Sequence, residues 1–184
     1  SKDIISGAEY TIMVRLSGKY ITAQSNGNVC QWENLQNASQ KWKIFVLESG
    51  MCKILCKQNP NLALTVDNGN SDNGNNISLK EYENLPSQHF ILHRTDDAYY
   101  ITAECSGNAA LDIYDISYEN GANLDQWDYW GGEGQKFYIR PVDNKYTLIK
   151  GNINGDNELD IFDRTSKKKG MVDTFDTVTY NIAD

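Results

Sequence analysis

The feature that most constrains this chain is a short motif that occurs three times at a nearly constant spacing. Each copy has a glutamine, then any residue, then a large aromatic residue, and successive copies are 48 and 47 residues apart. The copies are Gln40-Lys41-Trp42, Gln88-His89-Phe90 and Gln135-Lys136-Phe137. A repeat of this length cannot bury a hydrophobic face by itself. We therefore expect three similar units that close around one shared axis.

A second marker stands eight residues before each motif glutamine. The marker positions are Trp32, Lys80 and Trp127, and the similar stretches before them are Asn28-Val29, Asn76-Ile77 and Asn123-Leu124. Within each unit, short apolar runs alternate with turn-forming pairs such as Ser17-Gly18, a pattern typical of β-hairpins. No window before residue 150 has the apolar period of a long helix. The sequence predicts an all-β fold with about four short strands in each of the units 8–51, 52–97 and 98–150.

The phased Gln-x-aromatic copies resemble the ricin B-type β-trefoil lectins, which are also classified as carbohydrate-binding module family 13. The resemblance covers residues 8–150, about four fifths of the chain. It implies a β-trefoil in which the motif aromatic packs in the central core and the motif glutamine lies at the base of a sugar pocket. It also implies a carbohydrate ligand, no catalytic residues and no cofactor for the trefoil.

A sugar pocket needs an aromatic platform for the C–H face of the ring and polar groups for its hydroxyls. Pockets of this family combine an acid after the second strand, an aromatic platform and the motif glutamine. The resemblance assigns these positions in the third unit to Asp112, Trp127 and Gln135. The same comparison adds as sugar-binding candidates Asp125, where many relatives have a glutamine, and Tyr114 and Tyr129, which would widen the aromatic surface.

The other two units lack part of this set. The first keeps Trp32 and Gln40 but has Thr22 at the acid position, and its connecting loop is about five residues shorter. We therefore expect a weak or vestigial pocket there. The alternative for all three motif glutamines is that they only build the trefoil core.

The second unit departs further from the pattern. Thr65 stands at the acid position and Lys80 at the platform, while Gln88 is retained. Asp67 and Tyr82 are the candidates that would substitute for the missing acid and aromatic. The third unit is therefore the expected main site.

The character of the sequence changes after residue 150. Residues 152–163 place oxygen donors at the spacing of a calcium loop, which wraps six to eight oxygens around one ion. The expected ligands are Asn152, Asn154, Asp156, Asp160 and Asp163, with the backbone carbonyl of Glu158. This segment resembles the first half of a dockerin, whose second loop would begin at the last residue, and it implies a cohesin partner for the intact dockerin. The alternative is an Asn/Asp-rich loop that leads to a segment packed on the trefoil.

Composition restricts the possible functions. The net charge of −8 argues against nucleic acid, and no apolar stretch approaches the length that spans a bilayer. The four cysteines lack zinc-site spacing, and we expect buried free thiols. His89 and His93 are expected to be structural, and no acid pair has the setting of a glycosidase site.

The sequence therefore predicts a non-catalytic carbohydrate-binding module from a larger secreted, extracellular, bacterial glycoside hydrolase. Its expected target is plant polysaccharide that contains galactose, arabinose or xylose. Two alternatives remain: a free-standing galactose-type lectin or adhesin, and a β-trefoil protein-interaction module.

Overall fold

The computed structural model describes residues 4–142, 146–149 and 160–163. Residues 4–140 form one compact unit that contains three lobes of four strands each. Lobe 1 consists of β1 (Ala8–Val14), β2 (Tyr20–Ala23), β3 (Val29–Trp32) and β4 (Trp42–Val46). Lobe 2 consists of β5 (Cys52–Cys56), β6 (Leu62–Val66), β7 (Ile77–Glu81) and β8 (Phe90–Thr95). Lobe 3 consists of β9 (Ala98–Ala103), β10 (Ala109–Ile113), β11 (Leu124–Asp128) and β12 (Phe137–Pro141).

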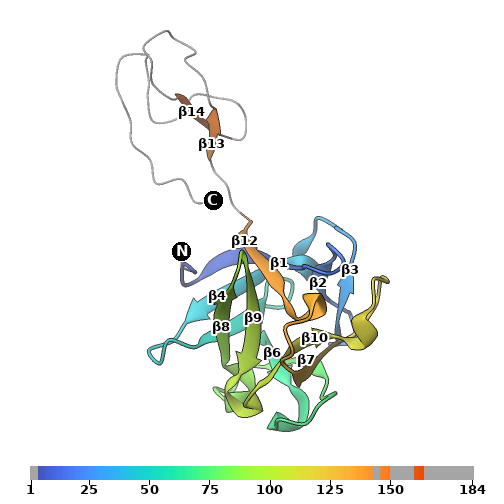
Figure 1. The fold of residues 1–184 in the computed structure, drawn as a ribbon. Helices are drawn as coiled ribbons and strands as arrows, with labels where there is room; N and C mark the ends of the chain where they lie inside the picture. Colours follow the sequence, from blue (N-terminus) through green and yellow to red (C-terminus); the bar gives the residue numbers. More distant parts are fainter. Residues whose placement is uncertain (1–3, 143–145, 150–159, 164–184) are drawn as a thin grey trace. The chain divides into compact units, whose positions relative to one another are not determined.

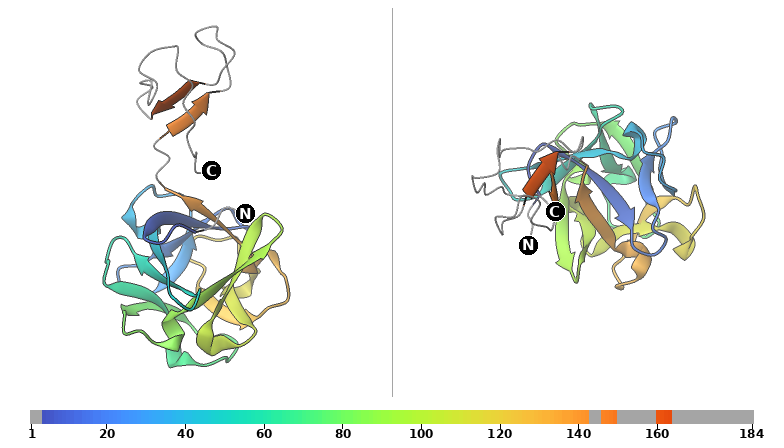
Figure 2. Two further views of the ribbon diagram at one scale, coloured as in Figure 1. Left: turned by 90° about the vertical axis from the view of Figure 1, so that its left-hand side faces the viewer. Right: turned by 90° about the horizontal axis from the view of Figure 1, so that it is seen from above.

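The first and last strands of the lobes close into a six-stranded barrel. The hydrogen-bonded order is β1, β4, β5, β8, β9, β12 and back to β1. The remaining strands form three hairpins, β2–β3, β6–β7 and β10–β11. Figures 1 and 2 show the strands curving around a common interior. This arrangement is a β-trefoil, so the predicted all-β fold with four strands per unit is confirmed.

A ring of three asparagines joins the three hairpins. The side-chain amide of Asn28 donates to Asn123 at 2.7 Å, that of Asn123 donates to Asn76 at 2.6 Å, and that of Asn76 donates to Asn28 at 2.9 Å. Each amide thus donates to one neighbour and accepts from the other. The asparagines that mark the repeats in the sequence meet on the approximate threefold axis, where each bond contributes about 1 kcal/mol.

The motif aromatics lie in the core, as the sequence predicts. Trp42, Phe90 and Phe137 are completely buried, and they pack with apolar residues of all three lobes. Trp42 also donates from its indole nitrogen to the carbonyl of Ile21 at 3.1 Å. The barrel thus receives one large ring from each lobe, from the residue that begins the lobe's fourth strand, which explains the constant spacing of the motif.

Between the strands, the described chain has only short 3₁₀-helices. Three of these end at the motif glutamines: η1 (Ala38–Gln40), η3 (Pro86–Gln88) and η6 (Glu133–Gln135). The other three follow strands of lobes 2 and 3: η2 (Asp67–Gly69), η4 (Glu104–Ser106) and η5 (Tyr114–Ile116). No helix among the described residues is long and apolar enough to cross a membrane.

Two strands belong to a second unit, which is described by itself. β13 (Tyr146–Ile149) pairs antiparallel with β14 (Asp160–Asp163), so that Tyr146 faces Asp163 and Ile149 faces Asp160. The sequence predicts a third repeat that extends to residue 150 and so includes residues 146–149. The compact trefoil unit ends at Arg140, and β13 has its partner in β14.

Candidate functional site

The three motif glutamines have the same role in holding the chain. Each side chain is buried and accepts a hydrogen bond from the backbone N–H five residues before it, at 2.8 to 3.0 Å. Each also donates to the backbone carbonyl seven residues before it: Gln40 to Glu33, Gln88 to Glu81 and Gln135 to Asp128. The glutamines therefore fix the segment that follows the third strand of each lobe, whether or not that lobe binds a ligand.

The residue that faces the motif glutamine distinguishes lobe 3. In lobes 1 and 2, a threonine hydroxyl accepts from the glutamine, Thr22 from Gln40 at 3.0 Å and Thr65 from Gln88 at 3.2 Å. In lobe 3 the equivalent residue is Asp112, and a hydrogen bond from Gln135 favours its ionised form. Lobe 3 therefore has a carboxylate where the other lobes have a hydroxyl.

Asp112 lies directly opposite Asp125 in the β10–β11 hairpin. Burial raises the pKa of both carboxyl groups, and the neighbouring Asp112 raises that of Asp125 further, to about 8. Asp125 is only 2% exposed, whereas Asp112 is partly exposed. The pair therefore favours a proton on Asp125, the more deeply buried acid, which can use it to hydrogen-bond to Asp112.

Asp112 and Asp125, which were both predicted from the sequence as sugar ligands, have different surroundings in the structure. Asp125 is the more deeply buried of the two, and its small exposed area leaves little contact for a ligand. Its Oδ1 atom is buried without a hydrogen-bond partner in the described structure. The arrangement makes Asp112 the exposed acceptor and Asp125 the residue that positions it.

Two tryptophans flank the motif glutamine of lobe 3. Trp127, the predicted platform, is 44% exposed, and its backbone carbonyl accepts from the side chain of Gln135 at 3.3 Å. Trp130 is 60% exposed, and its backbone N–H donates to Gln135 at 3.0 Å. The sequence analysis missed Trp130 because it compared only the marker positions. Comparison of the residues five positions before each motif glutamine would have found it, because lobe 3 has a tryptophan there, whereas lobes 1 and 2 have Leu35 and Glu83.

The two candidate tyrosines of lobe 3 have different surroundings. Tyr114 is 61% exposed and lies two residues after Asp112, at the end of β10. Tyr129 is stacked on Tyr100 with 3.9 Å between ring centroids, and Tyr100 is stacked on His93 at 4.3 Å. One face of the Tyr129 ring is therefore already covered, whereas Tyr114 offers its ring to solvent.

In lobe 2 the candidate substitutes already have partners. Asp67 accepts from Ser78 at 2.6 Å and forms an ion pair with Lys80 at 3.2 Å. The hydroxyl of Tyr82 lies 2.9 Å from His89, and the Lys53 ammonium lies 4.4 Å from the centre of its ring. A ligand in lobe 2 would have to compete with these contacts.

In lobe 1 the platform tryptophan is engaged in packing between lobes. The Trp32 ring lies 3.4 Å from where a β-carbon of Gly121 in lobe 3 would be. Trp127 lies similarly near Gly74 of lobe 2, at 3.9 Å, but Trp32 is the less exposed of the two rings. Lobe 1 also has no acid beside Gln40, since Thr22 occupies that place. Lobe 3 is therefore the lobe that combines an acid beside the motif glutamine with exposed aromatic rings.

The remaining titratable groups form no second reactive site in the described part of the chain. His89 contacts Tyr82 and Glu104, and His93 contacts Thr102 at 2.8 Å, which agrees with structural roles. The four cysteines are free thiols, and three of them are buried. Among the described residues, no group of acids, histidines and cysteines is arranged to hold a metal ion.

The predicted calcium loop falls largely outside the described residues. This holds for Asn152, Asn154, Asp156 and Glu158. Asp160 and Asp163 lie at the two ends of β14, and the described structure gives only their backbone. The calcium loop and the dockerin resemblance therefore remain predictions.

A closed six-stranded barrel with three hairpins defines the class of β-trefoils, and lobe 3 adds an acid beside its motif glutamine and exposed aromatic residues. The model of the ricin-type β-trefoil lectin domain-like family matches residues 4–80 and 81–172. The chain belongs to this family. The second match extends over residues 151–172 of the segment that resembles a dockerin. No match was found among curated proteins.

Several solved structures share the fold. ThreeFoil, a designed threefold symmetric protein, is 29% identical, with a TM-score of 0.68, over 71% of this chain and 96% of its own. The exo-β-1,3-galactanase 1,3Gal43A from Clostridium thermocellum is 23% identical, with a TM-score of 0.69, over 77% of this chain and 32% of its own. The ricin B-like lectin of Macrolepiota procera, solved with lactose, is 16% identical, with a TM-score of 0.65, over 74% of this chain and 97% of its own.

Proposed function

We propose that this chain binds carbohydrate through lobe 3, with Asp112 as the main hydrogen-bond acceptor. The trefoil is a ricin B-type carbohydrate-binding domain, a kind found both in glycoside hydrolases and in free lectins, and it is itself non-catalytic. The observation that carries the proposal is the partly exposed Asp112, which is hydrogen-bonded to Gln135 and lies opposite Asp125 in the β10–β11 hairpin. A carboxylate has two oxygens that accept from neighbouring hydroxyls of one sugar ring.

The aromatic rings would supply the second half of the site. Trp127 would be the platform for the C–H face of a sugar, and Trp130 and Tyr114 are further exposed rings of the same lobe. One exposed monosaccharide buries little area, so we expect a Kd on the order of 0.1 to 1 mM. Galactose-type sugars are the first to test, because the Macrolepiota procera lectin was solved with lactose and the earthworm R-type lectin with GalNAc.

We propose further that the domain serves an attached glycoside hydrolase that is secreted and bacterial. The matched region is about a third of the Clostridium thermocellum galactanase, so a trefoil of this kind occurs within a larger enzyme. Binding to plant polysaccharide that contains galactose, arabinose or xylose would raise the local concentration of substrate around such an enzyme. If the tail is part of a dockerin, a cohesin would be its partner.

A free-standing lectin is the second candidate. The match covers almost the whole length of the Macrolepiota procera lectin chain, so a lectin can consist of little more than one trefoil. Arrays that carry plant polysaccharides and galactose-terminated glycoproteins separate the two candidates. Preference for the polysaccharides supports the enzyme-associated module, and preference for the glycoproteins supports the lectin.

The binding site itself is tested by tryptophan fluorescence during titration with lactose, L-arabinose and xylobiose. Trp127→Ala should lose most of the binding, whereas the matched Trp32→Ala variant in lobe 1 should retain it. Equal loss in both variants, or full binding by Trp127→Ala, would contradict the assignment to lobe 3.

A further inference from the structure

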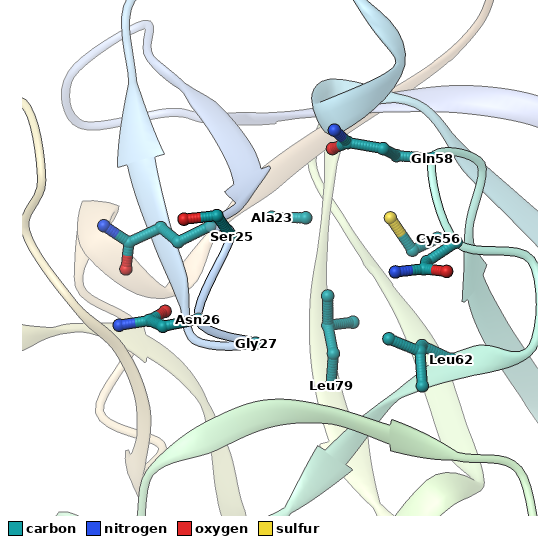
Figure 3. A pocket seen from close by; sticks show the side chains of 10 residues that line it. Ala23, Ser25, Asn26, Gly27, Cys56, Gln58, Leu62 and Leu79 are labelled. Carbon is teal, nitrogen blue, oxygen red and sulfur yellow. The ribbon is translucent and has the colours of Figure 1, made fainter.

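A pocket of about 460 Å³ lies between lobes 1 and 2, away from the Asp112 site. One side is the β2–β3 turn of lobe 1, residues 24–27, and the other side is the β5–β6 connection of lobe 2 with Leu79 of β7. Figure 3 shows Leu62 and Leu79 pointing toward the space that Ala23 and Cys56 bound from the other direction. The volume lies within the range of about 300 to 1,000 Å³ that is usual for small-molecule sites.

The threefold symmetry explains why the space is open here. At the two equivalent places, a buried glutamine on the third strand fills the gap between lobes. Gln31 donates to the carbonyls of Ser117 and Glu119 at 2.9 and 2.8 Å. Gln126 donates to the carbonyls of Asn70 and Asp72 at 2.7 and 3.0 Å. In both cases a neighbouring lobe reaches over with a long loop to receive the glutamine.

Leu79 occupies the equivalent position in lobe 2, and it cannot make these bonds. The backbone link between lobes remains, because the N–H of Leu79 donates to Gly27 at 2.7 Å, as Gln31 does to Ala122 and Gln126 to Asn75. The β2–β3 turn is about five residues shorter than the loops of the other lobes, so it does not cover the space. Lobes 1 and 2 are thus joined by a backbone hydrogen bond but lack the side-chain bridge that the glutamine provides at the other two junctions.

The residues that line the pocket are chemically complementary to a neutral ligand with many hydroxyl groups. No charged residue lines the pocket, and its rim carries the side-chain amides of Gln24, Asn26, Gln58 and Asn59. The amides of Gln58 and Asn59 are exposed and have no hydrogen-bond partner in the described part of the chain. An amide both donates and accepts, which matches a hydroxyl, and the apolar floor matches the C–H surface of a sugar.

We propose that this pocket is a second saccharide site, for a neutral mono- or disaccharide. It differs from the lobe 3 site because it uses no acid and is formed between two lobes. With two sites on one domain, binding to a polysaccharide gains from effective concentration and exceeds the affinity of either site.

The test is NMR of the whole chain with ¹⁵N-labelled side-chain amides, titrated separately with lactose and xylobiose. We expect Gln58 and Asn59 amide shifts that saturate, in the wild type and in Asp112→Ala alike. Leu79→Trp places a larger side chain in the space and should abolish these shifts while the Gln135 amide still responds. Gln58→Ala changes an exposed residue and should weaken the response of Asn59 without affecting the fold.

Two outcomes overturn the proposal. If Gln135 responds but Gln58 and Asn59 do not, the second site is absent while the lobe 3 site stands. If the Gln58 and Asn59 shifts persist in Leu79→Trp, or increase linearly without saturation, the effect is adventitious and the pocket is not a site. A response of Gln58 and Asn59 with a silent Gln135 would instead reject the lobe 3 proposal alone.

Discussion

Replacing Asp125 with asparagine tests how the acid pair of lobe 3 is built. Asp125 faces Asp112 across the β10–β11 hairpin, and burial together with Asp112 raises its pKa from 3.8 to about 8. Asparagine has nearly the shape of the protonated acid, and its N–H can replace the O–H that donates to Asp112. We therefore expect Asp125→Asn to fold and to leave Asp112 in place.

The magnitude follows from proton linkage. The unfolded chain loses the proton of Asp125 near pH 3.8, whereas the folded chain holds it until about pH 8. Within this window the folded state binds one more proton, so the stability that is present at low pH decreases by about 1.4 kcal/mol for each pH unit. Asparagine has no such proton. The unfolding free energy of the variant minus that of the wild type should therefore increase by about 1.4 kcal/mol per unit between pH 5 and pH 7.

The assay is urea unfolding followed by tryptophan fluorescence at several pH values in this window. Asp72→Asn is the matched control, because it removes an exposed carboxylate from a surface loop, and its difference from the wild type should stay flat. A difference that does not depend on pH for Asp125→Asn, or one that increasingly favours the wild type as pH rises, would refute the protonated state of Asp125.

Three further predictions concern the surroundings of the site and the tail. In Gly132→Ala, the new β-carbon would lie 2.2 Å from the exposed Trp130 ring, so the ring should be displaced and sugar binding weakened in a calorimetric titration, while chemical unfolding changes by no more than about 0.5 kcal/mol. Trp130→Ala should weaken sugar binding about fivefold, or about 1 kcal/mol, in a calorimetric titration, with no comparable loss of stability. If residues 152–163 bind calcium, calcium titration of the whole chain should release heat that Asp156→Ala abolishes, and a silent wild type would reject the loop.

The fold was predictable because the repeats are themselves a structural constraint. In each lobe the motif aromatic is a buried ring, and the motif glutamine fixes the preceding segment by hydrogen bonds. Trp42, Phe90 and Phe137 are completely buried in the structure, as this pattern predicts. The repeated asparagines were visible as markers. Their closed ring of hydrogen bonds was not, because it depends on how three hairpins meet.

The site was only partly predictable, because its chemistry depends on strand register. Asp112 and Asp125 are opposite each other only in the observed pairing of β10 with β11. Without that register, the two acids look like independent ligands, and the proton that they share cannot be inferred. Trp130 lies outside the marker positions, so comparison of repeats at those positions alone did not find it.

The pocket between lobes 1 and 2 required knowledge of both symmetry and packing. In the sequence, Leu79 is one more apolar residue on a predicted strand. Only the contacts of Gln31 and Gln126 show that this position normally bridges to the next lobe. Once this role is known, the leucine in the second repeat indicates that the bridge between lobes 1 and 2 is missing.

The most direct measurement of the central claim is calorimetric titration of Asp112→Ala and Thr65→Ala with the sugar that binds the wild type best. The two residues occupy equivalent positions in lobes 3 and 2, and each faces its motif glutamine. We expect Asp112→Ala to raise the Kd at least tenfold, a loss of about 1.4 kcal/mol or more, and Thr65→Ala to leave it unchanged. Wild-type affinity in Asp112→Ala, or an equal loss in Thr65→Ala, would contradict a carbohydrate site centred on lobe 3.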